Sequence, residues 1–397
     1  MISTNQSDLF GVVTENPAFL TEQIITYIGN KRALLDFIGQ AISLVKQELK
    51  REKLKLFDVF SGSGIVSRFF KQHAETLYSN DLESYSCLIN ECYLANRSDV
   101  DTAALQNTLK ELQKKIKANL HDGFIAELYS PKDEKNIQRG ERVFFTRRNA
   151  QYIDTARQEI AKLPADEQKF FLAPLLYGAS VHNNTSGVFK GFYKNRDGIG
   201  QFGGTGKNAL LRILGDIKLQ MPVFSNFDCD CHILKEDATT AAGKITEEVD
   251  LAYLDPPYNQ HPYGSNYFML NLILNYQRPT DISKVSGIPT DWNHSLYNQK
   301  QKAQNALFDL VKTLKAKYVL ISYNSDGFVK FDEFVDFLSG IGDLHTIPFL
   351  AKTDWQSFTD ALREIRYDGD LTLEADGFLK GMPDEILPVA ANLMART

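Results

Sequence analysis

The sequence lacks the features that would place it among secreted, membrane or metal-binding proteins. Only four cysteines occur in 397 residues, and neither Cys87 and Cys92 nor Cys229 and Cys231 have the two-residue gap of a zinc knuckle or redox motif. The longest apolar stretch, residues 170–181, is too short to span a bilayer, and the first residues lack the basic start and apolar core of a secretory signal. We therefore expect reduced thiols, no bound metal, no membrane association and a cytoplasmic location.

Positive charge is also scarce, since the net charge is −6. Residues 343–397 hold ten acids and five bases, so the rest of the chain carries a net charge of only −1. Residues 187–218, however, hold six bases against two acids, a local charge of +4. Such a patch suits the phosphates of a nucleic acid, although a solvated face is the common alternative. The candidate DNA contacts in it are Lys190, Lys194, Arg196 and Lys207.

The first part of the chain alternates between helical and strand-like patterns. Apolar residues recur at helical spacing over residues 31–50, and residues 55–60 and 76–81 read as strands separated by a short helix. Further strand patterns occur at residues 232–234, 249–255 and 317–323. This alternation predicts an α/β fold with a doubly wound, Rossmann-like parallel sheet.

Between residues 84 and 228 the pattern changes to helices and polar loops. Helices are expected over residues 101–120, 150–162 and 166–181, while residues 130–148 and 187–206 are irregular and basic. We therefore predict a split catalytic domain, residues 1–83 and 229–342, interrupted by a mostly helical insertion, residues 84–228. Residues 343–397 form an atypical acidic C-terminal segment.

The segment Asp255-Pro256-Pro257-Tyr258 directly follows the apolar run of residues 249–254. Neither proline has an N–H, and the residue before each is kept out of the α region, so a rigid, extended lip is expected at this strand end. The Asp255 carboxylate and the Pro256 carbonyl both accept hydrogen bonds, and Tyr258 offers an aromatic face. Two acceptors and a stacking ring suit a planar heterocycle that carries an NH2 group, such as adenine.

Paired acceptors would also activate that amine. The lone pair of the exocyclic nitrogen of adenine is delocalised into the ring, and two acceptors that grip its hydrogens would aim the lone pair at an incoming methyl group. No covalent intermediate is needed, and no cysteine lies near Asp255 in the sequence, as methylation at C5 of a pyrimidine would require. The alternative for these four residues alone is a strand-terminating turn with a surface tyrosine.

Residues 58–64, Asp-Val-Phe-Ser-Gly-Ser-Gly, have the chemistry of an adenosyl site at the end of the first strand. Gly62 and Gly64 let the backbone approach a ligand closely, and the start of the following helix favours a carboxylate such as the methionine end of S-adenosylmethionine. The third glycine of the dinucleotide fingerprint and the Gly-Lys-Ser/Thr of a P-loop are both absent. A plain strand-to-helix turn is the alternative.

Other residues could complete such a site. Asp81 ends the second strand, where an acid can accept the ribose hydroxyls, and Asp237 follows the third strand, where it would reach the adenine of the cofactor. Lys31 could pair with the cofactor carboxylate, with Tyr27 packed beside it. Each has a plainer explanation, namely a helix N-cap for Asp81, a surface loop acid for Asp237 and a solvated lysine for Lys31.

The segment after the lip, residues 259–276, is rich in aromatic residues. Tyr263, Asn266, Tyr267 and Phe268 belong to it. These side chains could clamp a base taken out of the double helix, although aromatics at helical spacing are more often core residues.

These segments together resemble the α-class, Dam-type DNA adenine methyltransferases, which include bacterial modification methylases. The matching pieces, in chain order, are residues 27–31 (Tyr-Ile-Gly-Asn-Lys), 58–64, 79–81 (Ser-Asn-Asp), 255–258 and 318–324 (Tyr-Val-Leu-Ile-Ser-Tyr-Asn). That class places its target-recognition domain between the two halves of the sheet, where the insertion falls here. Residues 182–194 look like the recognition region of related bacterial modification enzymes.

The resemblance implies two sets of site residues. The residues that would hold S-adenosylmethionine are Tyr27, Lys31, Asp58, Phe60, Gly62, Gly64, Asp81 and Asp237. The residues that would handle the target adenine are Asp255, Pro256, Pro257 and Tyr258. It implies no metal.

The implied activity is sequence-specific methylation of the exocyclic amine of adenine in duplex DNA. The base would be flipped out and the methyl group transferred directly from the sulfonium. We expect a monomer that acts on duplex DNA, either as a phage-type methylase or beside a cognate restriction endonuclease that acts separately. Structured RNA as the substrate, and a non-catalytic DNA-binding protein on the same fold, remain as alternatives.

Residues 354–375 depart from this pattern. They resemble the last βα segment of the sugar-phosphate isomerase/epimerase barrels, in which the acid that matches Glu374 can bind metal. One such segment cannot close an eight-stranded barrel, so we predict no isomerase activity.

Overall fold

The computed structural model describes residues 13–342, except residues 208 and 325. The chain divides into two compact units, residues 1–323 and residues 324–397. The sheet and the pocket described below belong to the first unit. The described part of the second unit contains the helix α14 (Phe331–Ser339). The acidic segment predicted for residues 343–397, with its isomerase-like stretch, lies outside the described residues.

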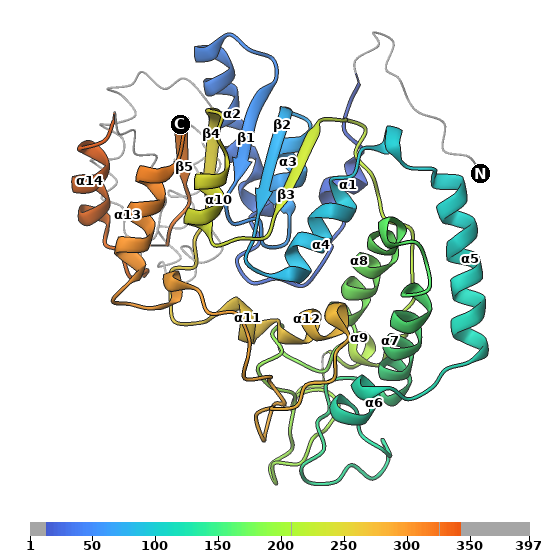
Figure 1. The fold of residues 1–397 in the computed structure, drawn as a ribbon. Helices are drawn as coiled ribbons and strands as arrows, with labels where there is room; N and C mark the ends of the chain where they lie inside the picture. Colours follow the sequence, from blue (N-terminus) through green and yellow to red (C-terminus); the bar gives the residue numbers. More distant parts are fainter. Residues whose placement is uncertain (1–12, 208, 325, 343–397) are drawn as a thin grey trace, which may run out of the picture. The chain divides into compact units, whose positions relative to one another are not determined.

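One parallel sheet organises the first unit, with strand order β3-β2-β1-β4-β5 (Figure 1). The strands are β1 (Leu54–Asp58), β2 (Ala74–Asn80), β3 (Asp230–Leu234), β4 (Val249–Leu254) and β5 (Ala316–Ile321). The strand β4 is buried along its whole length, as expected of a central parallel strand covered on both faces. The predicted doubly wound α/β fold is therefore confirmed.

The register of the sheet brings the two chemical motifs together. Asp58 at the end of β1 pairs with Tyr253 near the end of β4, so the glycine-bearing and proline-bearing segments follow neighbouring strands. The chain order along the sheet reverses between β1 and β4. Open α/β sheets bind ligands in the crevice at such a point, outside the carboxyl ends of the strands.

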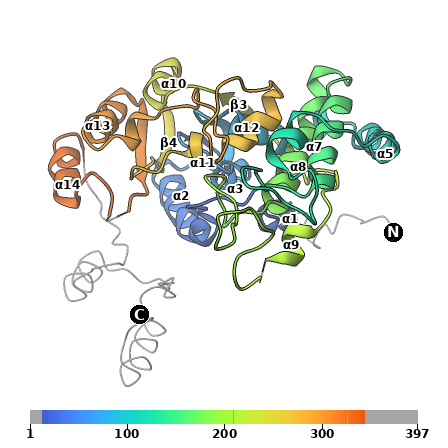
Figure 2. The ribbon, with the colours of Figure 1, turned by 90° about the horizontal axis from the view of Figure 1, so that it is seen from below.

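Helices cover the sheet on both faces. They include α2 (Leu35–Leu49), α3 (Ile65–Lys71), α10 (Ala238–Lys244) and α13 (Ala303–Thr313). Figure 2 shows α2 and α10 on opposite faces. The predicted apolar stripe of α2 is buried at Ile38, Ile42 and Val45, one residue per turn, which explains why this segment is helical. The 3₁₀ helix Arg32–Leu34 leads into it.

A second group of helices lies beside the sheet (Figure 1). Its members within the insertion are α4 (Ser84–Tyr93), α5 (Thr102–Ala118), α6 (Phe124–Tyr129), α7 (Arg147–Ile160), α8 (Ala165–Val181) and α9 (Leu210–Leu214). The short helix α1 (Pro17–Thr21), together with α11 (Tyr263–Asn266) and α12 (Phe268–Asn275), comes from outside it. The helices predicted within the insertion are confirmed to within a few residues. Because α4 packs against β2 and β3 as well as α8, the domain boundary at residue 84 stays a prediction.

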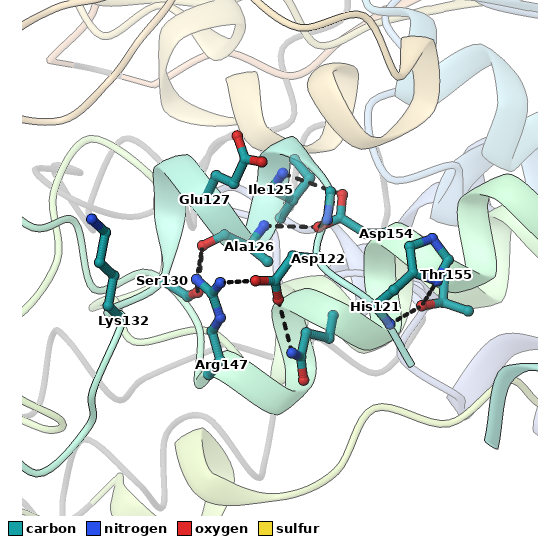
Figure 3. Close-up of polar contacts among 12 residues, drawn as sticks. His121, Asp122, Ile125, Ala126, Glu127, Ser130, Lys132, Arg147, Asp154 and Thr155 are labelled. Atoms are coloured by element: carbon teal, nitrogen blue, oxygen red, sulfur yellow. Dashed lines mark hydrogen bonds and ion pairs between the residues drawn. The ribbon is translucent and has the colours of Figure 1, made fainter. Parts of the chain in front are cut away.

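The buried carboxylate of Asp154 on α7 holds the start of α6 through hydrogen bonds (Figure 3). Asp154 on α7 accepts hydrogen bonds from the backbone N–H groups of Gly123, Ile125 and Ala126 at 2.8 to 3.2 Å. The Tyr276 hydroxyl donates to the same carboxylate at 2.7 Å. Asp154 thus satisfies the free N–H groups at the start of α6, which no residue of α6 itself caps.

Candidate active site

A pocket opens at the carboxyl ends of β1, β2 and β4. Its empty volume is about 860 Å³, a figure that includes open solvent at its mouth. The predicted site residues on its wall are Tyr27, Lys31, Phe60, Gly62, Asp81, Asp237, Asp255 and Pro257. Four others, Asp58, Gly64, Pro256 and Tyr258, lie outside the wall.

The lip after β4, residues 255–258, is neither helix nor strand. Pro256 is buried, while Asp255 and Tyr258 are half-buried. Among the described residues no donor reaches the Pro256 carbonyl, so this acceptor is available. The Tyr258 ring stands edge-on to Tyr323, with ring centroids 6.3 Å apart. The two acceptors and the aromatic ring predicted for the lip thus belong to three of its four residues, and their joint action on a base stays a prediction.

Asp255 forms an ion pair that the sequence did not predict. The Lys31 Nζ lies 2.6 Å from its Oδ2, and the two side chains are only 16% and 22% exposed. The same Nζ donates to the Gly29 carbonyl at 2.9 Å. Burial raises the pKa of Asp255, and the Lys31 ammonium opposes this rise. Lys31 thus helps keep the Asp255 carboxylate ionised in a desolvated place.

The turn after β1 is closed by the acid at the end of β2. Gly62 has φ +51°, and its N–H donates to Asp81 Oδ2 at 2.7 Å. A Cβ at Gly62 would lie 2.9 Å from Tyr27 Cε1, so only glycine fits there. The Glu83 N–H donates to Asp81 Oδ1 at 2.8 Å, which is the turn contact expected of a capping acid. Asp81 thus closes this turn and also faces the pocket.

Asp58 and Gly64 stand behind the pocket. Asp58 Oδ2 accepts from Ser67 Oγ at 2.6 Å, and its Oδ1 has no partner among the described residues. Burial raises the pKa of Asp58 to about 7, against the lowering effect of the Ser67 hydrogen bond. Gly64 has φ +76°, and a Cβ there would meet Asn90 Oδ1 at 2.6 Å. Direct contact of either residue with a ligand stays a prediction.

Aromatic rings and an acid form the far wall, beyond β2. The Phe60 ring meets the Tyr297 ring edge-on at 5.0 Å. Asp237 caps α10 by accepting from the Thr239 N–H at 3.0 Å, yet it also lines the pocket. The plain capping explanation and the binding explanation of Asp237 are therefore compatible.

The tyrosines after the lip pack on the Tyr27 segment. The rings of Tyr27, Tyr263 and Tyr267 cluster together, with the Tyr27 centroid 5.1 Å from that of Tyr263 and 4.8 Å from that of Tyr267, and the latter two 6.0 Å apart. The Tyr267 hydroxyl accepts from the Ile28 N–H at 2.8 Å, and Tyr267 is fully buried. Tyr267 and the buried Phe268 are thus core residues, which was the plainer alternative for this aromatic segment.

Several wall residues were missed from the sequence. They are Glu83, Asn293, Ser295, Tyr297 and Asn298. Glu83 Oε2 accepts from Asn271 and Asn293, and burial raises the pKa of Glu83 to about 7. Its place two residues after Asp81 was an available signal. The loop residues 293–298 reach the pocket only through the fold and carry no local motif.

The predicted DNA contacts lie on the irregular loop of residues 187–207. Lys190, Lys194, Arg196 and Lys207 are all exposed there. The Lys194 Nζ lies 5.0 Å from the centroid of the Phe192 ring. Arg212, by contrast, is anchored by backbone carbonyls of Asn183 and Thr185. The four predicted side chains are thus free to meet a ligand, but none borders the pocket.

Two kinds of feature are absent from the described residues. None of their helices combines the length and apolar character needed to cross a membrane. Within the same residues, no group of three or more histidines, cysteines and acids is arranged to hold a metal ion.

A parallel α/β sheet with a pocket at its switch point, beside an acidic lip that contains two prolines, is the architecture of α/β proteins that bind a ligand at the strand ends. The chain belongs to the D12 class N6 adenine-specific DNA methyltransferase family, which it matches over residues 27–337. Methylation of adenine at N6 in DNA, the predicted activity, is therefore confirmed. Enzymes of this kind act on DNA and generally take the methyl group from S-adenosylmethionine.

Type II methyltransferases are among the similar proteins. The Type II methyltransferase M.CviAII of Paramecium bursaria Chlorella virus 1 is 32% identical over 330 residues, which cover 81% of this chain and 90% of that protein. The Type II methyltransferase M.NlaIII of Neisseria lactamica is 28% identical over 342 residues, with coverage of 84% and 92%. For the Type II methyltransferase M.FokI of Planomicrobium okeanokoites, 28% identical over 327 residues, the match covers 80% of this chain but 47% of that relative.

Proposed function

We propose that the pocket binds S-adenosylmethionine and that the lip beside it receives the target adenine, as in the Dam-type class. The observation that carries this proposal is the pairing of β1 with β4, which sets Gly62 and Asp255 on the wall of one pocket. The order of the five matching segments along the chain supports the Dam-type assignment.

The residues of the pocket fit the cofactor. Gly62 lines the pocket and lies against the Tyr27 ring, which also lines it. Asp81 would receive the ribose hydroxyls, while Phe60 and Asp237 would border the adenine of the cofactor. The remaining predicted contacts are Tyr27, Lys31, Asp58 and Gly64. When bound, S-adenosylmethionine supplies an electrophilic methyl group on a sulfonium.

The lip would hold and activate the target base. Asp255 and the Pro256 carbonyl accept the two hydrogens of the exocyclic amine, Pro257 stiffens the lip, and Tyr258 stacks on the flipped ring. The grip on both hydrogens strengthens as the nitrogen becomes tetrahedral, so it favours the transition state over the ground state. The amine proton released on methylation would pass to Asp255, whose ionised form is stabilised by Lys31.

We further propose that duplex DNA lies across residues 187–207, called the basic loop below. Lys190, Lys194, Arg196 and Lys207 would then lie near its phosphates. Their exposure and the local charge of +4 support this placement. The split domain arrangement, with residues 84–228 as the recognition part, rests on the same grounds. The names of the relatives favour a type II modification enzyme, and we propose that it acts as a monomer, separately from its cognate endonuclease.

A substrate comparison tests the proposal. The protein is incubated with S-adenosylmethionine labelled in its methyl group and with either duplex DNA or structured RNA of the same sequence. We expect label in DNA only, because the family to which the chain belongs methylates adenine in DNA. Equal or greater labelling of RNA would instead support the RNA alternative. DNA sequencing with detection of methylated adenine in an expressing host would then give the recognition sequence.

A further inference from the structure

The segment after α12 forms a small hairpin. It lies outside the glycine motif of residues 58–64, the lip of residues 255–258 and the insertion of residues 84–228. Ile282 and Pro289 make an antiparallel bridge, and the Ser283 N–H donates to the Ile288 carbonyl at 2.8 Å. Gly287 turns the chain with φ +70°. This hairpin, residues 281–290, lies between the catalytic lip and the pocket residues 293–298 in the sequence.

Side chains of the insertion hold the hairpin in place. Arg142 Nη2 donates to the carbonyls of Ser283 and Lys284 at 3.3 Å each, and the Tyr129 hydroxyl donates to the Gly287 carbonyl at 2.6 Å. A Cβ at Gly287 would lie 2.7 Å from Arg142 Nε. These two side chains contact the backbone of the hairpin and leave the side chains of Lys284 and Val285 unused.

The hairpin also meets the basic loop directly. Ser286 Oγ donates to the Lys190 carbonyl at 2.5 Å, and Lys190 is one of the predicted DNA contacts. Figure 1 shows the hairpin descending beside the loops of residues 130–146 and 187–207. Those two loops are joined by Arg139, which donates to the Asp197 carbonyl at 2.8 Å. Three loops from distant parts of the chain therefore form one surface.

This surface has the charge that a duplex requires. Residues 130–146, 187–207 and 277–292 together contain ten lysines and arginines against six acids, a net charge of +4 in a chain whose total is −6. A polyanion such as DNA would be attracted to this region even though the net charge of the whole protein is negative.

The tip of the hairpin carries one exposed base and one exposed apolar residue. Lys284 is exposed, and Val285 is 60% exposed. The other base of the segment, Arg278, is paired with Glu127 at 2.5 Å, whereas Asp281 and Asp291 lie at the base of the hairpin. An apolar side chain held out in a basic surface suits contact with base edges or sugars in a groove.

We propose that residues 281–290 form a further DNA-contacting element, outside the predicted recognition insertion. Lys284 lies against a phosphate, and Val285 makes an apolar contact with bases or sugars next to the target site. The proposal rests on the proposed function, because it adds a contact to the duplex that the lip methylates.

The salt dependence of DNA binding separates the two contacts. Lys284→Ala, Val285→Ser and, as a matched control, Lys114→Ala on the exposed face of α5 are titrated with a fluorescent duplex between 50 and 200 mM salt. Lys284→Ala should weaken binding about threefold to tenfold and lower the slope of log K against log salt by about one. Val285→Ser should weaken binding about threefold or more with the slope unchanged. Lys114→Ala should match the wild type.

Cofactor affinity and thermal unfolding are measured in parallel, and both should be unchanged in all three variants. Two tip variants that bind and methylate DNA like the wild type, while Lys190→Ala binds it more weakly, would overturn the proposal and leave the proposed function intact. A wild-type protein that binds DNA but transfers no methyl group to adenine would instead refute the proposed chemistry, whatever the tip variants do. A weakened Lys284→Ala variant with an unchanged salt slope would contradict the phosphate contact.

Discussion

At the scale of single residues, the most unusual feature of the site is a group of carboxyl side chains that are largely shielded from water. Four acids near the pocket are buried (Asp58 and Glu83) or half-buried (Asp81 and Asp255), and this burial raises the pKa of each. Within the part of the chain that the structure describes, only Asp255 of these four acids has a cation in direct contact, Lys31 at 2.6 Å. The acid with the proposed chemical role is therefore the one whose ionised form the protein stabilises most directly.

Removing the Lys31 charge should move the pH dependence of methylation. Without the ammonium, the pKa of the buried Asp255 rises further, so a higher pH is needed to supply the carboxylate. We expect the acid limb of kcat/KM for Lys31→Gln to shift upward by about one pH unit or more, and Lys31→Arg to restore it largely. Steady-state rates from pH 5 to 9, with cofactor affinity measured separately, provide the check.

The same experiment separates two roles of Lys31. If Lys31 serves only the cofactor carboxylate, as the sequence predicts, Lys31→Gln loses cofactor affinity and keeps the wild-type acid limb. That result would remove Lys31 from the chemistry of Asp255.

Glu83 should make stability depend on pH. Its folded pKa of about 7 lies above the ordinary value of 4.5, so the folded state binds more protons than the unfolded state in this window. The contribution of Glu83 to stability is thus complete below about pH 4.5 and falls by up to about 3 kcal/mol as the pH rises through 7. Glu83→Gln should flatten this dependence, although Asp58 leaves a remaining slope of the same sign.

Urea unfolding at pH 5 and pH 7.5 measures the effect of Glu83. The control is Glu111→Gln on the exposed face of α5, which should retain the slope of the wild type. An identical slope in Glu83→Gln would mean that Glu83 is not the titrating group.

At the scale of elements, the helices and strands could be predicted where the spacing of apolar residues and the residues at the element ends indicate them. The strand β4, with its continuous apolar run, and α2, with its apolar stripe, were both predicted to within a few residues. Contacts that only the fold creates were not predictable. Lys31 and Asp255 are 224 positions apart, and the loop of residues 293–298 reaches the pocket without any motif of its own.

The cap that Asp154 gives to α6 is the clearest test at this scale. An asparagine keeps the shape but has one acceptor oxygen in place of two, so some of the three N–H groups lose their partner. We expect Asp154→Asn to lower the free energy of unfolding by about 2 to 3 kcal/mol. The exposed first-turn acid of α8 supplies the control, since Asp166→Asn should cost about 0.5 kcal/mol or less. If both variants lost the same free energy of unfolding, the hydrogen bonds of Asp154 would contribute no more to stability than an exposed acid does.

At the scale of the whole molecule, overall charge is a poor guide and its distribution a good one. A net charge of −6 argues against nucleic-acid binding until the acidic residues 343–397 are counted separately from the basic loops. Family membership over residues 27–337 then fits a chain whose pocket, lip and basic surface all lie in its first unit. The family could be predicted from the order of the motifs along the sequence. The surface formed by residues 130–146, 187–207 and 277–292 could not, because these loops meet only in the folded chain.

The central claim is that the Asp255 lip methylates the exocyclic amine of adenine beside the cofactor pocket. Duplex DNA treated with the protein and S-adenosylmethionine is digested, and its nucleosides are analysed by mass spectrometry. The same is done with Asp255→Asn after its cofactor affinity has been shown to be retained. We predict N6-methyladenine with the wild type and a loss of at least about a hundredfold with the variant. Undiminished N6-methyladenine from Asp255→Asn would contradict the account.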